Sequence, residues 1–85
     1  MAALSKEDTD RLFMIYLNFG PHLKEILGKK KLKPTVLASR MGIAPSNVYT
    51  YTSMGYHPDM FNLIKMAEAL EISVDELVGL KELES

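Results

Sequence analysis

The basic side chains of the sequence are concentrated in one stretch, and they are the residues with the clearest chemical character. Residues 23–58 carry a formal charge of +5, whereas residues 1–22 carry -1 and residues 59–85 carry -5. Much of the positive charge comes from a short run of lysines, Lys29, Lys30, Lys31 and Lys33. Such a run is commonly a solvated loop. Beside a pair of helices, however, it favours binding of a polyanion such as nucleic acid.

Residue patterns of a catalytic or metal centre are missing from the sequence. The chain has no cysteine, which excludes disulfides, thiolate chemistry and cysteine-based zinc sites. Its two histidines, His22 and His57, have no second ligand at helical spacing, so we assign no metal and no cofactor. There is no nucleophile elbow, paired carboxylate motif or phosphate-binding glycine loop. We therefore expect a protein that is not an enzyme and has no small-molecule substrate.

Length and composition predict a single small globular domain. The chain has 85 residues, of which 47% are hydrophobic and 25% are charged. These fractions are ordinary for a soluble domain. Its longest apolar run, residues 12–17, is far shorter than the roughly 20 residues that span a bilayer. The segment before that run lacks the basic start and cleavage site of a signal peptide. We expect a cytoplasmic protein without a membrane partner.

Apolar spacing and capping residues predict an all-α fold without strands. Ser5 and Asp8 resemble a capping box at the start of the first helix, and Gly20-Pro21 is expected to end it. The apolar residues of this helix cover most of its circumference, so some are expected to face a second chain. We divide the chain into an N-terminal extension, 1–20, and a second unit, 21–85. The predicted helices are 6–19, 21–30, 34–41, 45–53, 60–70 and 74–79.

Residues 34–51 predict two short helices that cross closely. Ala38 is small enough to let the helix axes approach, and Gly42 suits a left-handed residue that ends the first helix. Pro45 suits the first position of the second helix. The second helix then has a small and polar outward face. The residues expected to point inward are Leu37, Ala38, Met41, Val48 and Tyr51.

This ordered series of small, glycine and apolar residues resembles the Cro/CI-type (XRE-like) helix-turn-helix family of DNA-binding proteins over about residues 21–80. The resemblance implies a compact helical bundle of the lambda-repressor-like type with an extra N-terminal helix. It also implies that the helix at 45–53 is the recognition helix, with its first residues in the major groove of DNA. The residues that carry the resemblance are Leu37, Ala38, Gly42, Ile43, Val48, Tyr51, Pro58, Leu63, Ala67, Leu70, Ser73 and Leu77.

The same resemblance implies which residues contact DNA. The positions that face base edges are Ala44, Pro45, Ser46 and Thr50, with Asn47 and Tyr49 beside them. The preceding helix would cross the phosphate backbone, where its N-terminal amides bind phosphate. The positions assigned to phosphate are Lys30, Lys31, Lys33, Thr35, Tyr56 and His57.

The sequence departs from the family pattern at three places. Pro34 stands where the family often has Gln, which removes one side-chain contact to phosphate. Thr52 and Met54 stand where Glu and Gly are usual, and the glycine follows one residue late. The short side chains of the recognition face cannot make the bidentate base contacts worth about 1–3 kcal/mol of discrimination. We expect more reliance on DNA shape, phosphate and water-mediated contacts.

The function expected from these features is sequence-specific binding of double-stranded DNA by a small, repressor-like transcriptional regulator. A homodimer is expected, formed through the N-terminal helix or through the C-terminal tail with Val78, Leu80 and Leu83. The sequence does not choose between these two interfaces. The alternative function is a protein-interaction adaptor or anti-repressor-like module that keeps the scaffold without binding DNA. A pI of about 6.1 and the weakly donating recognition face support that alternative.

Overall fold

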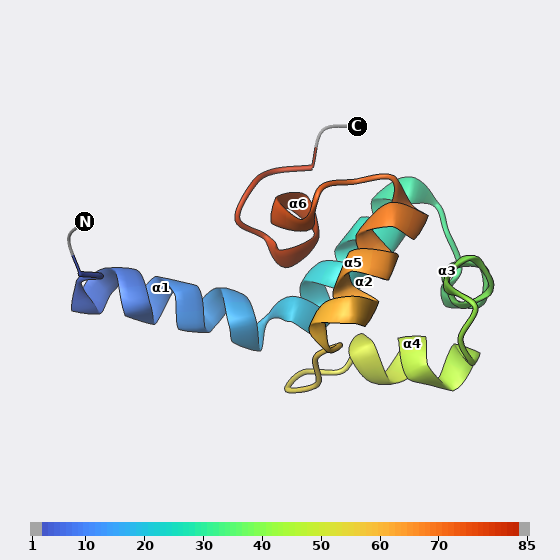
Figure 1. Ribbon diagram of the computed structural model, residues 1–85, viewed down its shortest axis with the longest axis horizontal. Coiled ribbons are helices and arrows are strands. Elements are labelled where there is room, and N and C mark those ends of the chain that lie inside the picture. The colour runs from blue at the N-terminus through green and yellow to red at the C-terminus, as the bar shows by residue number, and fades with distance from the viewer. Residues whose placement is uncertain (1–2, 84–85) are drawn as a thin grey trace.

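The computed structural model of the chain describes residues 3–83, which form six helices and no strand. The helices are α1 (Lys6–Leu17), α2 (Phe19–Lys30), α3 (Pro34–Met41), α4 (Pro45–Tyr51), α5 (Met60–Leu70) and α6 (Val74–Val78) (Figure 1). The predicted all-α class is confirmed. None of the helices among the described residues is long and apolar enough to cross a membrane.

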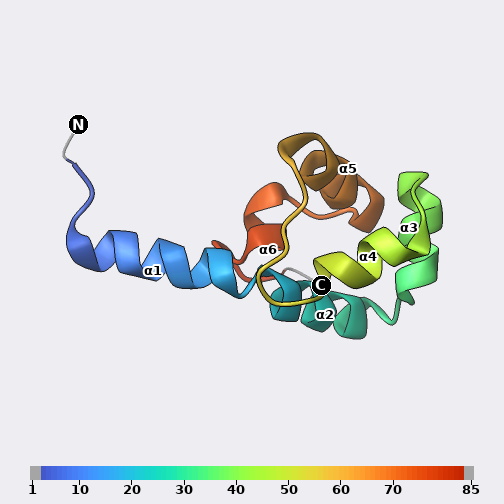
Figure 2. The ribbon, with the colours of Figure 1, turned by 90° about the horizontal axis from the view of Figure 1, so that it is seen from below.

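Five of the helices pack into one globule, and α1 extends away from it. In two perpendicular views, α3 lies at one end of the molecule and α1 projects from the other (Figures 1 and 2). The chain therefore measures 41 Å along its longest axis but only 26 and 21 Å along the others. Helix α4 lies along an edge of the globule, with its C-terminal end towards α1 (Figure 1).

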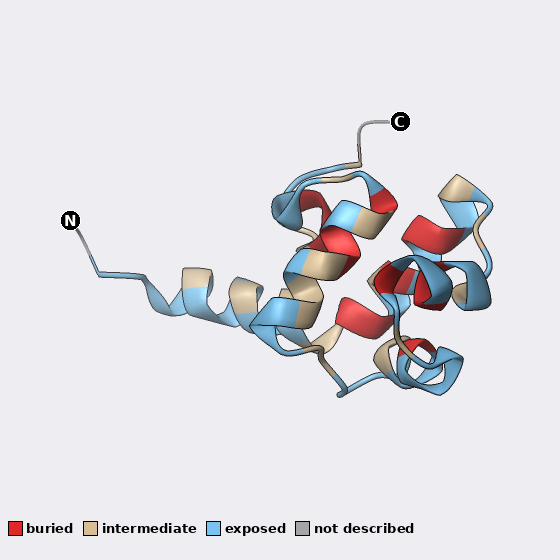
Figure 3. Cartoon of the chain, turned by 45° about the vertical axis from the view of Figure 1, so that its right-hand side comes forward, coloured by how far each residue is buried: buried red, intermediate tan, exposed pale blue. Residues whose placement is uncertain are grey.

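The hydrophobic core lies among α2, α3, α5 and α6, with one side chain from α4. Buried residues recur on the inner faces of these helices at spacings of three and four, as amphipathic helices require. Figure 3 shows buried segments throughout the globule but none on the projecting part of α1. The buried apolar residues are Phe19, Leu23, Ile26, Leu27, Leu37, Ala38, Met41, Val48, Met66, Ala67, Leu70 and Leu77.

The break between the first two helices lies at Asn18, two residues earlier than the Gly20-Pro21 break that we predicted. The Asn18 side chain donates a hydrogen bond to the carbonyl of Met14 and thereby caps the end of α1. The first amides of a helix have no partner within it, so Pro21 fits the first turn of α2. Helix α4 likewise ends at Tyr51, earlier than the predicted residue 53.

Several helix ends agree with the capping residues read from the sequence. The Ser5 hydroxyl accepts a hydrogen bond from the amide of Asp8 at the start of α1. At the start of α6, Ser73 and Glu76 exchange both hydrogen bonds of a capping box. The Asp59 carboxylate accepts the amide of Asn62 at the start of α5. These local bonds fix the residues at which the three helices begin.

Candidate nucleic-acid interface

The turn between α3 and α4 has the geometry predicted from its glycine. Gly42 adopts φ 71° and ψ 33°, a left-handed conformation that side chains other than glycine rarely accept. The amide of Ile43 then reaches back to the carbonyl of Ala38 at 3.0 Å. Ala44 is the N-cap of α4, and Pro45 occupies its first turn. Only three residues therefore separate the two helices, which fixes how α4 leaves α3.

The crossing of α3 and α4 is held by small and apolar contacts. Leu37 and Ala38 on α3 and Val48 on α4 have no exposed surface at all. Tyr51 is half-buried and packs against the core, as expected. Val48 is the one fully buried residue of α4, and the helix presents its other side at the surface, with Pro45, Ser46, Asn47, Tyr49 and Thr50 exposed.

The outward face of α4 carries the short polar side chains of Ser46, Asn47 and Thr50 together with Pro45 and Tyr49. The Thr50 hydroxyl donates to the carbonyl of Ser46 at 3.0 Å, one turn earlier, so its oxygen lone pairs remain directed outward. Among residues 3–83, the Asn47 amide makes no hydrogen bond and is available as both donor and acceptor. All six positions assigned to base edges are exposed: Ala44, Pro45, Ser46, Asn47, Tyr49 and Thr50.

The lysines near α3 are mostly free of ion pairs. Lys29 pairs with Glu25 at 3.2 Å, one turn earlier on α2. Within the described residues, Lys30, Lys31 and Lys33 form no ion pair. Lys31 ends α2 in a left-handed conformation, and Lys33 is the N-cap of α3. These lysines and the exposed Thr35 in the first turn of α3 lie next to the helix pair in sequence, and Figure 2 shows the end of α2 leading into the start of α3.

The two residues assigned to phosphate in the loop after α4 have different surroundings. Tyr56 is 58% exposed. His57 is half-buried, and its ring stacks on Tyr16 of α1 with centroids 3.9 Å apart and planes 12° apart. The His57 Nε2–H donates to the carbonyl oxygen of Tyr16, so this nitrogen is not available to a phosphate in this arrangement. The loop after α4 is thus attached to α1.

A second contact, which sequence reasoning missed, joins the start of α2 to the end of α4. Gly20 is buried, and a Cβ added to it would lie 2.6 Å from the carbonyl oxygen of Ser53 and 2.7 Å from that of Thr52. Both atoms belong to the backbone just after α4. The glycine is required for this close approach of two chain segments. The sequence signal for this contact was Gly20 itself, which lies at a predicted helix boundary. We interpreted Gly20 as the end of a helix.

Arg40 provides a further contact that the sequence did not reveal. Its Nη1 donates to the carbonyl oxygen of Ala69 at 3.2 Å, near the C-terminal end of α5. Arg40 is one of the six Lys and Arg residues of 23–58, and this hydrogen bond engages its guanidinium group. It connects the last turn of α3 to α5 and helps to fix the orientation of the helix pair.

The order, crossing and turn of α3 and α4 match a known family. A helix-turn-helix family model matches residues 23–77. The chain belongs to the helix-turn-helix family. Within this family it is of the Cro/CI (XRE-like) type that its residue series indicated. As a helix-turn-helix protein, it presents α3 and α4 as the two helices of the motif, and α1 lies outside the matched residues.

One relative of this helix-turn-helix protein is the cryptic phage CTXphi transcriptional repressor RstR of Vibrio cholerae serotype O1. The two are 46% identical over 43 residues, which is 51% of this chain and 38% of the relative. The match thus spans little more than a third of the relative's length. No solved structure gives a significant match.

Proposed function

We propose that this helix-turn-helix protein binds double-stranded DNA in a sequence-specific manner as a small, cytoplasmic transcriptional regulator of the repressor type. Helix α4 would lie in the major groove, and the N-terminal end of α3 would face the phosphate backbone. The observation that carries the proposal is the exposed polar face of α4, held rigidly by the buried crossing with α3. The partial match to a phage transcriptional repressor supports it.

Three cations next to the motif supply the attraction that such a function needs. Lys30, Lys31 and Lys33 are not neutralised by carboxylates of the described residues. The amides at the start of α3 add partial positive charge where a phosphate can bind. The face of α4 itself carries no cation. Affinity would therefore come mainly from phosphate contacts, whereas α4 would supply sequence preference through shorter-range hydrogen bonds.

The test is the salt dependence of binding to duplex DNA, measured by fluorescence anisotropy. A protein that neutralises Z phosphates shows a log-log slope of about -0.9Z. Replacing Lys30 and Lys33 by Glu is expected to weaken binding to every duplex by at least about tenfold and to make the slope shallower by about 2. Both changes follow from the loss of two phosphate contacts.

A matched control carries the same change of charge elsewhere. Lys24→Glu combined with Lys65→Glu alters residues of α2 and α5 that lie outside the helix pair and outside α1. This variant should keep nearly the parental affinity and the parental slope. Absence of duplex binding at low salt, or equal losses in the two double variants, contradicts the proposed interface.

Sequence preference is expected to depend on Asn47. Its amide is exposed and unbonded within the described part of the chain, and paired donor and acceptor groups suit an adenine edge. Asn47→Ala should weaken binding to the preferred duplex, selected from random DNA, by about tenfold, with little change for a scrambled duplex. Asn62→Ala on α5 is the control, and it should affect both duplexes equally. An equal loss on both duplexes for Asn47→Ala would show that the side chain does not read bases.

A second candidate function is supported by apolar side chains on and before α5. Met54, Met60 and Phe61 are 65%, 76% and 69% exposed, and Ile64 is 48% exposed. Exposed methionines and aromatic residues suit an adaptable surface for another protein. An adaptor that does not bind DNA would show no steep dependence on salt, so the duplex titration separates the two functions.

A further inference from the structure

Among the six helices, α1 makes the fewest contacts with the rest of the described chain. It contributes no buried residue, and Phe13, Met14 and Tyr16 are 56%, 55% and 55% exposed. Helix α1 has 12 residues, a length at which an isolated helix is only marginally stable in water. A further surface packed on the apolar residues of such a projecting helix would stabilise it.

The exposed apolar residues of α1 are organised rather than scattered. The rings of Phe13 and Tyr16 stack with centroids 6.2 Å apart, and Tyr16 in turn stacks on His57. His57 also lies 6.1 Å from the buried ring of Phe19. An aromatic row therefore runs from the core outward along α1, with its outer half exposed. Aromatic side chains in such a row are typical anchors of protein interfaces.

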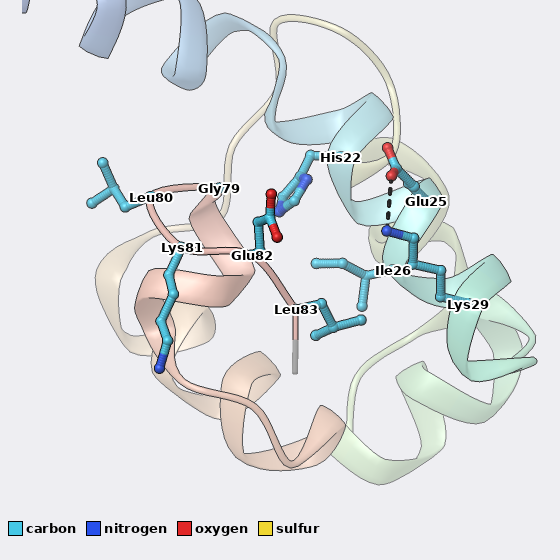
Figure 4. Close-up of a pocket in the computed structure, with 9 residues that line it drawn as sticks. All are labelled: His22, Glu25, Ile26, Lys29, Gly79, Leu80, Lys81, Glu82 and Leu83. Atoms are coloured by element: carbon cyan, nitrogen blue, oxygen red, sulfur yellow. Dashed lines mark ion pairs between the residues drawn. The ribbon is translucent and has the colours of Figure 1, made fainter. Parts of the chain in front are cut away.

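The C-terminal tail, the other interface considered from sequence, is largely occupied by its own chain. Val78 and Leu83 are half-buried, and Leu83 extends towards Ile26 of α2 (Figure 4). The tail thereby closes one side of a groove of about 450 Å³ against α2, beside the ion pair of Lys29 with Glu25. Leu80 alone among the three tail residues is exposed, at 50%. One leucine is too small a surface for a stable dimer.

The surface of α1 is large enough for an interface with a second copy. Leu4 is 66% exposed, and Leu12, Ile15 and Leu17 are partly exposed beside the aromatic row. Because these side chains surround α1, one partner helix covers only part of them, and two copies could bury at most roughly 1,000 Å², the lower bound of specific interfaces. Interfaces of this size are often weak, so a dimer that exchanges with monomer is the expected state.

We propose that α1 is a self-association arm, in which the α1 helices of two copies pack antiparallel around a two-fold axis within residues 12–17. Two features favour the antiparallel direction. Each globule is joined to the C-terminal end of its α1, so an antiparallel pair places the two globules at opposite ends, whereas a parallel pair crowds them at one end (Figure 1). A parallel pair would also place the acidic first turns, with Glu7 and Asp8, side by side.

This inference deepens the proposed DNA-binding function. Its consequence for DNA binding, described next, rests on that proposed function. The end of α1 is attached to the segment after α4 through His57, and the start of α2 contacts the same segment at Gly20. Pairing of two α1 helices would therefore fix the two α4 helices relative to each other. A two-fold dimer with fixed recognition helices reads two half-sites at a set spacing.

Self-association is tested by sedimentation velocity of the full chain from low to about 100 μM, a range that covers weak dimers. We expect the parental chain to form dimers as concentration rises. Phe13→Glu should remain monomeric throughout, because it places a charge in the aromatic row. Phe61→Glu and Leu80→Glu alter two exposed apolar positions outside α1, and both variants should still dimerise. Circular dichroism checks that each variant is folded.

The direction of pairing is tested with spin labels, for which the absence of native cysteine is an advantage. Single labels at Met14→Cys and Lys6→Cys are compared by pulsed electron resonance. With the two-fold axis near residue 14, the Lys6 labels of an antiparallel pair should lie roughly 24 Å farther apart along the helix axis than the Met14 labels, because eight helical residues span about 12 Å on each side. Similar distances at both positions would overturn the antiparallel arrangement.

The outcomes separate the arm from the DNA-binding function. A parental chain that stays monomeric, or a Phe13→Glu variant that still dimerises, overturns the self-association arm even if DNA binding is observed. A dimer that is lost only in Phe13→Glu supports the arm even if no duplex is bound, in which case the proposed function fails alone. If both hold, Phe13→Glu should bind a single half-site normally and lose affinity for paired half-sites only.

Discussion

Gly20→Ala is expected to destabilise the fold by about 1–3 kcal/mol, which is the usual effect of forcing extra atoms into a packed site. The new Cβ would lie 2.6 Å from the Ser53 carbonyl oxygen and 2.8 Å from its carbon. These atoms are backbone, so no side chain can rotate away, and the segment after α4 must move. The gain from replacing a helical glycine, about 0.5–1 kcal/mol, opposes this effect but is smaller.

Gly28→Ala in the same helix is a close control. No atom lies within 4 Å of a Cβ added there, so only the helical preference of alanine should act. Gly28→Ala should stabilise the protein by about 0.5–1 kcal/mol. Urea or thermal unfolding followed by circular dichroism measures both variants, and about 1 kcal/mol corresponds to about 4–8 °C for a domain of this size. Equal effects of the two substitutions would show that the contact at Gly20 is not constrained.

The helix pair was predictable from sequence because its determinants are local. The left-handed position at Gly42, the small residue at Ala38 and the proline at the start of α4 each restrict the backbone within a few residues. Capping residues similarly located the starts of α5 and α6. The family resemblance then supplied the direction of the outward face, which spacing alone does not give. The structure presents that face at the surface, while its contacts with DNA remain predictions.

The contacts around α1 were not predictable because they join residues far apart in sequence. Tyr16 and His57 are separated by 41 residues, and neither residue type specifies the other. Gly20 followed by proline is a normal signal for the end of a helix. Its tertiary role in admitting the backbone at Ser53 overrides that signal, and the break moves to Asn18. Sequence reasoning did detect that α1 has more apolar surface than one core requires.

Because of these contacts, the position of the C-terminal end of α4 depends on the N-terminal part of the chain. Ala44 and Pro45 fix the start of α4 through the turn from α3. Its other end is followed by residues that contact Gly20 and then by His57, which is bonded to α1. The short helix therefore has support at both ends although only Val48 is buried. Support of this kind keeps a recognition surface in one geometry before it meets its ligand.

Ala38→Leu is expected to disrupt the crossing of α3 with α4 and to weaken both stability and binding. Ala38 is fully buried, and the three added carbons would force the two helices apart at a cost of about 1–3 kcal/mol. Because Val48 is the one fully buried side chain of α4, the displacement falls mainly on the exposed face of α4. Binding to the selected duplex should drop by at least about tenfold in protein that is still folded. Ser39→Leu adds similar bulk at the neighbouring exposed position and should leave unfolding and binding nearly unchanged. Parental affinity in a folded Ala38→Leu variant would mean that the close approach of α3 and α4 does not position the DNA-binding face.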